Sequence, residues 1–85
     1  MSPQDIEALL EDRPFRRFRI VVSDGTSYEI RHPGQVLLGL ASVTIGLPPG
    51  PETHYYEKTR HVSLFHVVSL DLVGEGQQGN GQTGS

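Results

Sequence analysis

Apolar residues near the N-terminus recur at helical spacing. Ile6, Leu9 and Leu10 fall at positions i, i+3 and i+4, so they form one narrow apolar stripe. Ser2 and the proline after it are typical of a helix start, because the serine oxygen accepts a hydrogen bond from a first-turn N–H. The helix is expected to end before Pro14. A helix this short is marginal by itself, so its stripe must pack on a larger structure.

Between residues 18 and 31, apolar and polar residues alternate on either side of a turn. This period of two predicts two strands, residues 18–23 and 26–31, each with one buried face. The residues on that face are Phe18, Ile20, Val22, Tyr28 and Ile30. Asp24-Gly25 joins the strands as a hairpin turn, because both residues tolerate the positive φ that such a turn requires. The hairpin would place Glu29 opposite Arg17 or Arg19.

Two short apolar runs follow the hairpin. Residues 36–40 and 42–47 predict a strand, a tight turn and a second strand, and one continuous bent strand is the alternative. The stretch from Val36 to Leu47 contains no charged residue. The next segment, Pro48-Pro49-Gly50-Pro51, cannot form regular structure and predicts a stiff surface loop that extends to about Tyr56.

The last apolar stretch, residues 60–73, alternates in two sets that are out of phase across Phe65-His66-Val67. A register of period two cannot shift without a bulge or a turn, so two strands joined by a one-turn corner are expected there. From residue 74 onward the chain has no apolar side chain of any size and is rich in glycine and glutamine. The sequence therefore predicts a single domain at residues 2–73 and a disordered tail at residues 74–85.

Four segments of the chain together resemble a group of short uncharacterised bacterial proteins. These share the pattern RPF…PFRI…DG…RHP and end in an HI…I strand. The matching segments here are Arg13–Ile20, Ser23–Gly25, Ile30–Pro33 and His66–Leu70. Gly34 stands where the pattern has an acidic residue. The resemblance spans roughly residues 3 to 72, and it implies no activity and no assigned functional residues.

The order of the predicted elements also resembles a small barrel of the Sm-like or SH3-like type. That likeness rests on a helix followed by five short strands, with Asp-Gly after the first strand and a one-turn corner before the last. It implies an α+β or mainly β fold, in which the N-terminal helix precedes a five-stranded antiparallel barrel. Sm-like proteins form rings and bind RNA, but fold alone does not carry function.

Length and composition limit the classes of protein. A chain of 85 residues buries only about 60% of its unfolded surface, so its margin of stability is thin and self-association is the expected supplement. The absence of cysteine excludes disulfides and thiol nucleophiles, and the net charge of −3 gives no global basic field. No apolar run approaches the roughly 20 residues that span a bilayer, and the polar N-terminus is unlike a secretory signal. A cytoplasmic protein without membrane contact is expected.

The histidines, at positions 32, 54, 61 and 66, are the groups suited to proton transfer near neutral pH. Their spacing matches no zinc motif, so no metal and no cofactor is expected. Ser69, His66 and Asp71 have the residue types of a nucleophilic triad, but no nucleophile elbow accompanies them and that interpretation is rejected. His32 is retained as a candidate binding residue, although bracing the end of its strand is the preferred explanation.

A basic cluster interleaved with aromatic residues is the best candidate for a partner surface. It consists of Arg13, Arg16, Arg17 and Arg19, with Phe15 and Phe18 between them. Arginine binds phosphate and carboxylate groups through its planar fork, and aromatic rings stack on bases. The alternative, which we favour, is that the phenylalanines are core residues and that the arginines form ion pairs with Glu29, Glu11 and Asp12.

The sequence predicts a non-catalytic interaction or scaffolding module rather than an enzyme. Self-association through an exposed strand edge or through residues 36–47 is expected, because apolar and unprotected edges tend to pair. Another protein is a second possible partner. The alternative function is binding of RNA or single-stranded nucleic acid through the arginine cluster, with Tyr55 or Tyr56 as exposed anchors in the long loop.

Overall fold

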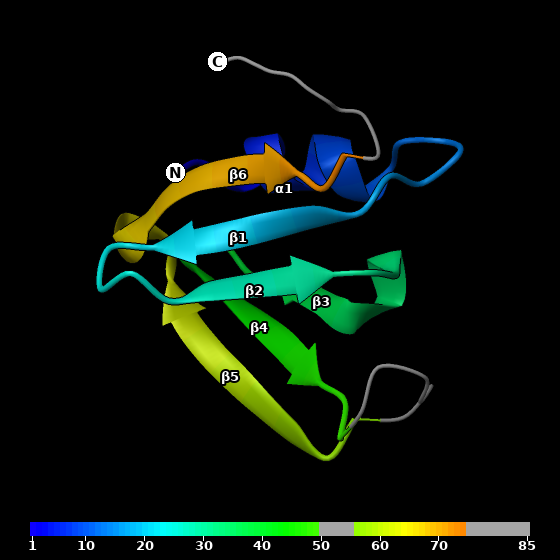
Figure 1. The fold of residues 1–85 in the computed structure, drawn as a ribbon. Helices are drawn as coiled ribbons and strands as arrows, with labels where there is room; N and C mark the ends of the chain where they lie inside the picture. The colour runs from blue at the N-terminus through cyan, green and yellow to red at the C-terminus, as the bar shows by residue number, and fades with distance from the viewer. Residues whose placement is uncertain (50–55, 75–85) are drawn as a thin grey trace.

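One short helix is followed by six strands in the computed structural model, which describes residues 1–49 and 56–74. The elements, in chain order, are α1 (Pro3–Leu10), β1 (Phe18–Val22), β2 (Ser27–Ile30), the 3-10 turn η1 (Pro33–Gln35), β3 (Val36–Leu38), β4 (Ser42–Leu47), β5 (Lys58–Ser63), the 3-10 turn η2 (Leu64–His66) and β6 (Val67–Leu72) (Figure 1). The tail beyond residue 74, expected to be disordered, lies outside the described residues, as do His54 and Tyr55.

The strands form two three-stranded antiparallel sheets, with the orders β2-β1-β6 and β3-β4-β5 (Figure 1). The five-stranded Sm-like or SH3-like barrel expected from the sequence is therefore wrong. Within the described residues there are six strands, and no strand pairing joins the two sheets into a closed barrel. Closure requires hydrogen bonds between the last free edges, and these depend on residues far apart in the chain, so local alternation does not specify them.

The predicted N-terminal helix is present but shorter than expected. It ends at Leu10, where the Glu11 N–H donates to the Glu7 carbonyl oxygen (3.0 Å) and the Asp12 N–H donates to the Leu9 carbonyl oxygen (3.4 Å). The Ser2 hydroxyl does not accept a hydrogen bond from a first-turn N–H but donates to Asp5 Oδ2 (3.1 Å), and the Asp5 N–H donates to the Ser2 carbonyl oxygen (3.2 Å). Ile6 is the one residue of the helix that is fully buried. Leu9 and Leu10 are partly buried and pack against the same core, so the whole apolar stripe contacts it.

The hairpin of β1 and β2 follows the predicted register. Phe18 lies opposite Ile30, and Arg19 lies opposite Glu29. Gly25 has a φ of +94°, the left-handed conformation that favours glycine in this turn. Asp24 stabilises the same turn, because its Oδ1 accepts a hydrogen bond from the Thr26 main-chain N–H (2.9 Å).

The expected corner between the last two strands is the 3-10 turn η2. Ser63 Oγ accepts a hydrogen bond from the Phe65 N–H (3.2 Å) and so caps the turn. The register of β6 against β1 then shifts: Val21 lies opposite Ser69, whereas Val22 lies opposite Val67. The extra residue of this bulge is Val68, which is 58% exposed, whereas Val67 is buried. The turn also directs β6 onto β1, in the other sheet from β5.

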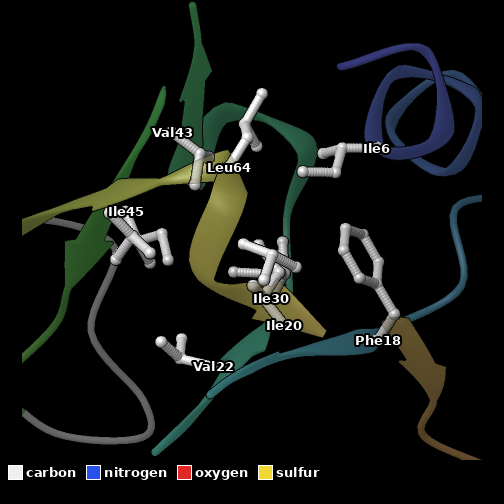
Figure 2. Close-up of a cluster of buried hydrophobic side chains, with 10 residues drawn as sticks. Ile6, Phe18, Ile20, Val22, Ile30, Val43, Ile45 and Leu64 are labelled. Carbon is white, nitrogen blue, oxygen red and sulfur yellow. The ribbon is translucent and has the colours of Figure 1, made fainter. Parts of the chain in front are cut away.

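The core lies between the two sheets and is closed on one side by α1. Its buried residues are Ile6, Phe18, Ile20, Val22, Ile30, Val43, Ile45, Val62, Leu64 and Val67 (Figure 2). Figure 2 shows Ile6 pointing from the helix into the same cluster as Phe18 and Leu64. No helix among the described residues is long and apolar enough to cross a membrane.

A buried amide connects the two sheets. Gln35 is 5% exposed, and its Nε2 donates both to the carbonyl oxygen of Glu29 on β2 (3.0 Å) and to that of Gly46 on β4 (3.0 Å). Its Oε1 accepts from the main-chain N–H of Arg31 (2.9 Å). The side chain therefore satisfies three main-chain groups at the end of the sandwich, where neither sheet provides partners for them.

Candidate interaction surfaces

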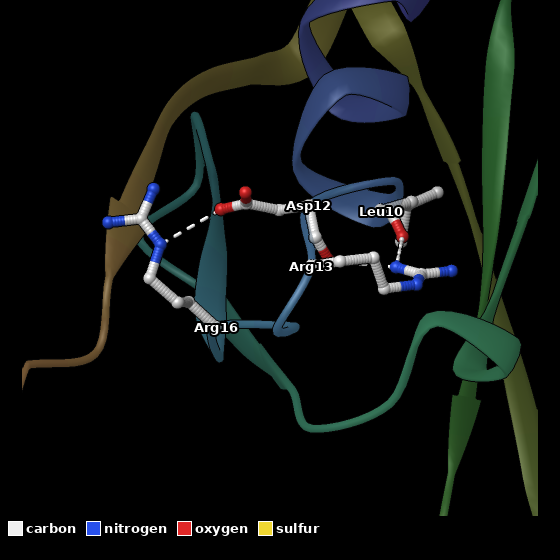
Figure 3. A network of polar contacts seen from close by, with 4 residues as sticks. All are labelled: Leu10, Asp12, Arg13 and Arg16. Atoms are coloured by element: carbon white, nitrogen blue, oxygen red, sulfur yellow. Dashed lines mark hydrogen bonds and ion pairs between the residues drawn. The ribbon is translucent and has the colours of Figure 1, made fainter.

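The arginines nearest the helix bind groups of their own segment. Arg13 Nη1 donates to the carbonyl oxygens of Leu10 (3.0 Å) and Asp12 (2.7 Å), so it caps the C-terminal end of α1. Arg16 Nε donates to Asp12 Oδ2 (2.9 Å). The two guanidinium groups lie on opposite sides of the segment (Figure 3). They do not form one basic surface.

The other two arginines lie beside acidic residues of the first sheet. Arg17 Nη1 is 3.4 Å from Glu29 Oε2. Arg19 lies between Glu29 on β2 and Asp71 on β6 in the strand register. The favoured interpretation is thus supported by two of the expected ion pairs, Arg16–Asp12 and Arg17–Glu29. Exposed pairs of this kind contribute about 0.2–1 kcal/mol each, so they cancel the local charge more than they stabilise the fold.

The aromatic members of the cluster are not free to stack on bases. Phe18 is fully buried, and Phe15 is half-buried with its ring centroid 6.1 Å from that of Phe18. A shallow hollow of about 610 Å³ opens beside Phe15, lined also by Arg16, Arg17 and Leu72. Both of its arginines already have acidic partners.

The remaining predicted binding residues lie apart from this cluster. His32 is an exposed residue immediately before η1, and it interacts with another group of the chain. Tyr56 packs over Gly46 of β4 and is 36% exposed. Tyr55 lies outside the described residues. The structure therefore does not bring the predicted binding residues together into one site.

A second hollow, of about 380 Å³, brings together polar residues that the sequence did not group. It lies between the turn of the β1–β2 hairpin and β5, and its polar lining includes Ser23, Asp24, Tyr28, Arg60, His61, Ser63 and His66. Ser23 Oγ lies 3.4 Å from Nδ1 of His66, a residue 43 positions away in the chain. The sequence instead placed His66 with Ser69 and Asp71. No local spacing signals the contact with Ser23, because a tertiary turn creates it.

The carboxyl group in this hollow is stabilised in its charged form. The Thr26 main-chain N–H, together with the Thr26 hydroxyl, donates to Asp24 and holds the pKa of that carboxyl below its ordinary value, and attraction to His66 acts in the same direction. His61 Nδ1 lies 2.9 Å from Thr44 Oγ1 on the neighbouring strand. Within the described part of the chain, no group of three or more His, Cys, Asp or Glu side chains is placed to hold a metal ion.

A third surface is apolar and protrudes from the molecule. Leu40, in the β3–β4 turn, is 94% exposed, and Phe65, in η2, is 89% exposed. Together with Met1, Ala41 and Leu64 they line a hollow of about 130 Å³. We call these five residues the Leu40–Phe65 patch. The Leu64 N–H donates to the Ala41 carbonyl oxygen (2.9 Å), which fixes the two loops side by side.

Leu40 also borders another hollow. This depression of about 310 Å³ is lined by Leu40 with Leu38 and, from α1, Pro3 and Glu7. Leu40 is thus shared by two hollows.

Comparisons of the chain with protein-family models, with curated proteins and with solved structures find no match.

Proposed function

We propose that this domain is a non-catalytic interaction module that self-associates through the Leu40–Phe65 patch. The observation that carries the proposal is the near-complete exposure of two large apolar side chains, Leu40 at 94% and Phe65 at 89%, on loops that a main-chain hydrogen bond holds together. Scattered apolar residues are normal on a protein surface, whereas adjacent ones around a recess are typical of an interaction site.

A second copy of the chain is the occupant that the shape of the patch favours. A two-fold interface requires one surface that is complementary to itself. Here the projecting side chains and the recesses belong to the same patch, so a rotated copy can place its Phe65 ring in the hollow of about 130 Å³. An apolar cavity of about 150 Å³ is large enough to bind benzene, so the size suits a phenyl ring.

The charges on the strand edges support this choice of surface. The free edges of the sheets are β2, β6, β3 and β5. Glu29, Asp71 and Arg60 lie on three of them, and charged side chains oppose pairing between edges. Only β3 has no charged residue, and the chain continues from it into Leu40. Association is therefore proposed at the β3–β4 turn, within the apolar stretch of residues 36–47.

Sedimentation equilibrium across the micromolar range tests the proposal. The parent chain is expected to associate reversibly, and Leu40→Ser and Phe65→Ser are each expected to weaken association about tenfold, because each removes a buried apolar anchor. Both residues are exposed in the monomer, so urea unfolding of the variants should change by no more than about 0.5 kcal/mol.

Leu72→Ser serves as the matched control, because Leu72 is 47% exposed but lines the separate hollow beside Phe15. It should leave association unchanged. A parent chain that remains monomeric throughout the concentration range contradicts the proposal, as does equal weakening by all three substitutions.

Binding of RNA or single-stranded nucleic acid through Arg13, Arg16, Arg17 and Arg19 stays a prediction with less support. Two of these arginines are in ion pairs, Arg13 caps the helix, and the intervening aromatic rings are packed. Titration with single-stranded RNA at two salt concentrations tests it, because phosphate contacts must weaken steeply as salt rises.

A further inference from the structure

The hollow between the β1–β2 hairpin and β5 lies where the two sheets fail to meet. The edge strand β2 borders it on one side and the edge strand β5 on the other. The Ser23 N–H donates to the His66 carbonyl oxygen (2.8 Å), so the hairpin turn and η2 are held together at one end of the hollow. This fixes the position of its polar rim independently of any ligand.

Two residues of the hollow project from the core-facing sides of their strands. Tyr28 lies opposite Ile20, and Arg60 lies opposite Ile45, and both isoleucines are fully buried. Directly opposed residues share one face of a sheet, so Tyr28 and Arg60 face the gap between the sheets. Val22 and Val62 line the same hollow and are buried. The floor is therefore apolar, with a phenol and a guanidinium at its mouth.

Arg60 is the principal charge of this hollow. Within residues 1–49 and 56–74 its side chain forms no hydrogen bond or ion pair, unlike Arg13, Arg16 and Arg17. An inward-pointing charge on an edge strand protects that edge from pairing, which accounts for a charged residue at this position. Edge protection does not account for the His66 imidazole and the serine hydroxyl groups that line the same space.

The imidazole of His66 leaves one nitrogen for a ligand. Its Nδ1 is near Ser23 Oγ, and among the described residues no hydrogen bond is recorded for its Nε2. His61 lies opposite Thr44, with its Nδ1 near Thr44 Oγ1, so its ring lies on the other face of β5 from Arg60. Asp24 is the one carboxylate among the described residues that line the hollow, and the Thr26 groups that donate to it stabilise its charged form.

We propose that this hollow binds a small organic molecule through its oxyanion, a phosphate or a carboxylate. Arg60 provides the constant positive charge and a planar set of donors that matches such a group. His66 provides a second donor at the rim. Tyr28 and Val62 contact the apolar body of the ligand. The volume of about 380 Å³ falls within the usual range of small-molecule sites, about 300–1,000 Å³.

Amide NMR spectra recorded during titration with phenyl phosphate test the site. Saturable shifts are expected at Ser23, Arg60, Val62 and His66, and both inorganic phosphate and phenol should bind more weakly, because each lacks one half of the ligand. Benzoate forms the second arm: tighter binding of phenyl phosphate assigns a phosphate ester to the site, and tighter binding of benzoate assigns a carboxylate.

Arg60→Gln should weaken phenyl phosphate binding about fivefold or more, because it removes the charge-assisted hydrogen bonds. Arg19→Gln is the matched control, since it changes the net charge equally and lies on the β2-β1-β6 sheet between Glu29 and Asp71. Equal weakening by both variants, shifts centred on Arg16 and Arg17, or titration without saturation would each overturn the proposal.

Discussion

Gly46 and Tyr56 illustrate a close packing contact between single residues. A Cβ atom at Gly46 would lie 2.7 Å from Tyr56 Cγ and 2.8 Å from Cδ1. No side chain fits at that distance, so the ring requires a glycine beneath it. Glycine otherwise weakens the interior of a strand, and close approach of another group is a usual reason for its presence. The sequence suggested Tyr56 as an exposed anchor, whereas the contact with β4 gives its ring a structural role.

Gly46→Ala is therefore expected to destabilise the fold by about 1–3 kcal/mol, because the tyrosine ring must move away from β4. Urea unfolding followed by circular dichroism measures the change. Gly34→Ala is the control, since a Cβ atom there meets nothing within 4 Å. Equal stability of the two variants would show that the Tyr56 ring can move away from β4 without lowering the free energy of unfolding.

The arginines show how far single residues are predictable. Ion pairing with Asp12 and Glu29 was foreseen, because these carboxylates are four positions from Arg16 and across a hairpin from Arg17. The neighbours of Arg60 and His66 were not foreseen. They come from strands whose pairing is not local, so no spacing in the sequence identifies them.

At the scale of elements, the buried side chain of Gln35 links the two sheets. Gln35 follows the β1–β2 hairpin and donates to carbonyl oxygens of β2 and β4. The sequence offered no signal for it, because an isolated glutamine is an ordinary surface residue. Its importance arises from burial, which makes the loss of its partners costly.

Gln35→Met should destabilise the domain by roughly 2–5 kcal/mol, since it removes the three buried or partly buried hydrogen bonds that this side chain forms with main-chain groups of Glu29, Arg31 and Gly46. Gln35→Glu should be at least as harmful at neutral pH, because it places a carboxylate oxygen against two carbonyl oxygens. Thermal unfolding compares both with Gln4→Met, an exposed position on α1. A loss no greater than that of the control would contradict the role of Gln35.

At the scale of the whole molecule, the helix closes a sandwich that is otherwise open. Ile6 is fully buried, with 0% of its surface exposed to solvent. It lies in one cluster with residues of both sheets. The helix has eight residues, too few to be stable alone. Its formation therefore depends on this contact.

Ile6→Ala should lower the free energy of unfolding by about 2–5 kcal/mol, because it leaves a cavity between the sheets. Loss of the small helical signal in circular dichroism should accompany it. The exposed neighbour Glu7 provides the control, and Glu7→Ala should keep both the helix and the stability. A stable Ile6→Ala variant with an intact helix would show that the helix is held elsewhere.

The sequence by itself determined the approximate positions of the helix and strands, the Asp24-Gly25 turn and the corner at η2. These features depend on residues a few positions apart, through side-chain alternation and the backbone freedom of glycine. The tertiary structure alone decided that β6 pairs with β1, that six strands divide into two sheets, and that Ser23 meets His66. Such contacts join distant parts of the chain, and the packing of the whole core selects among the many pairings that local alternation allows.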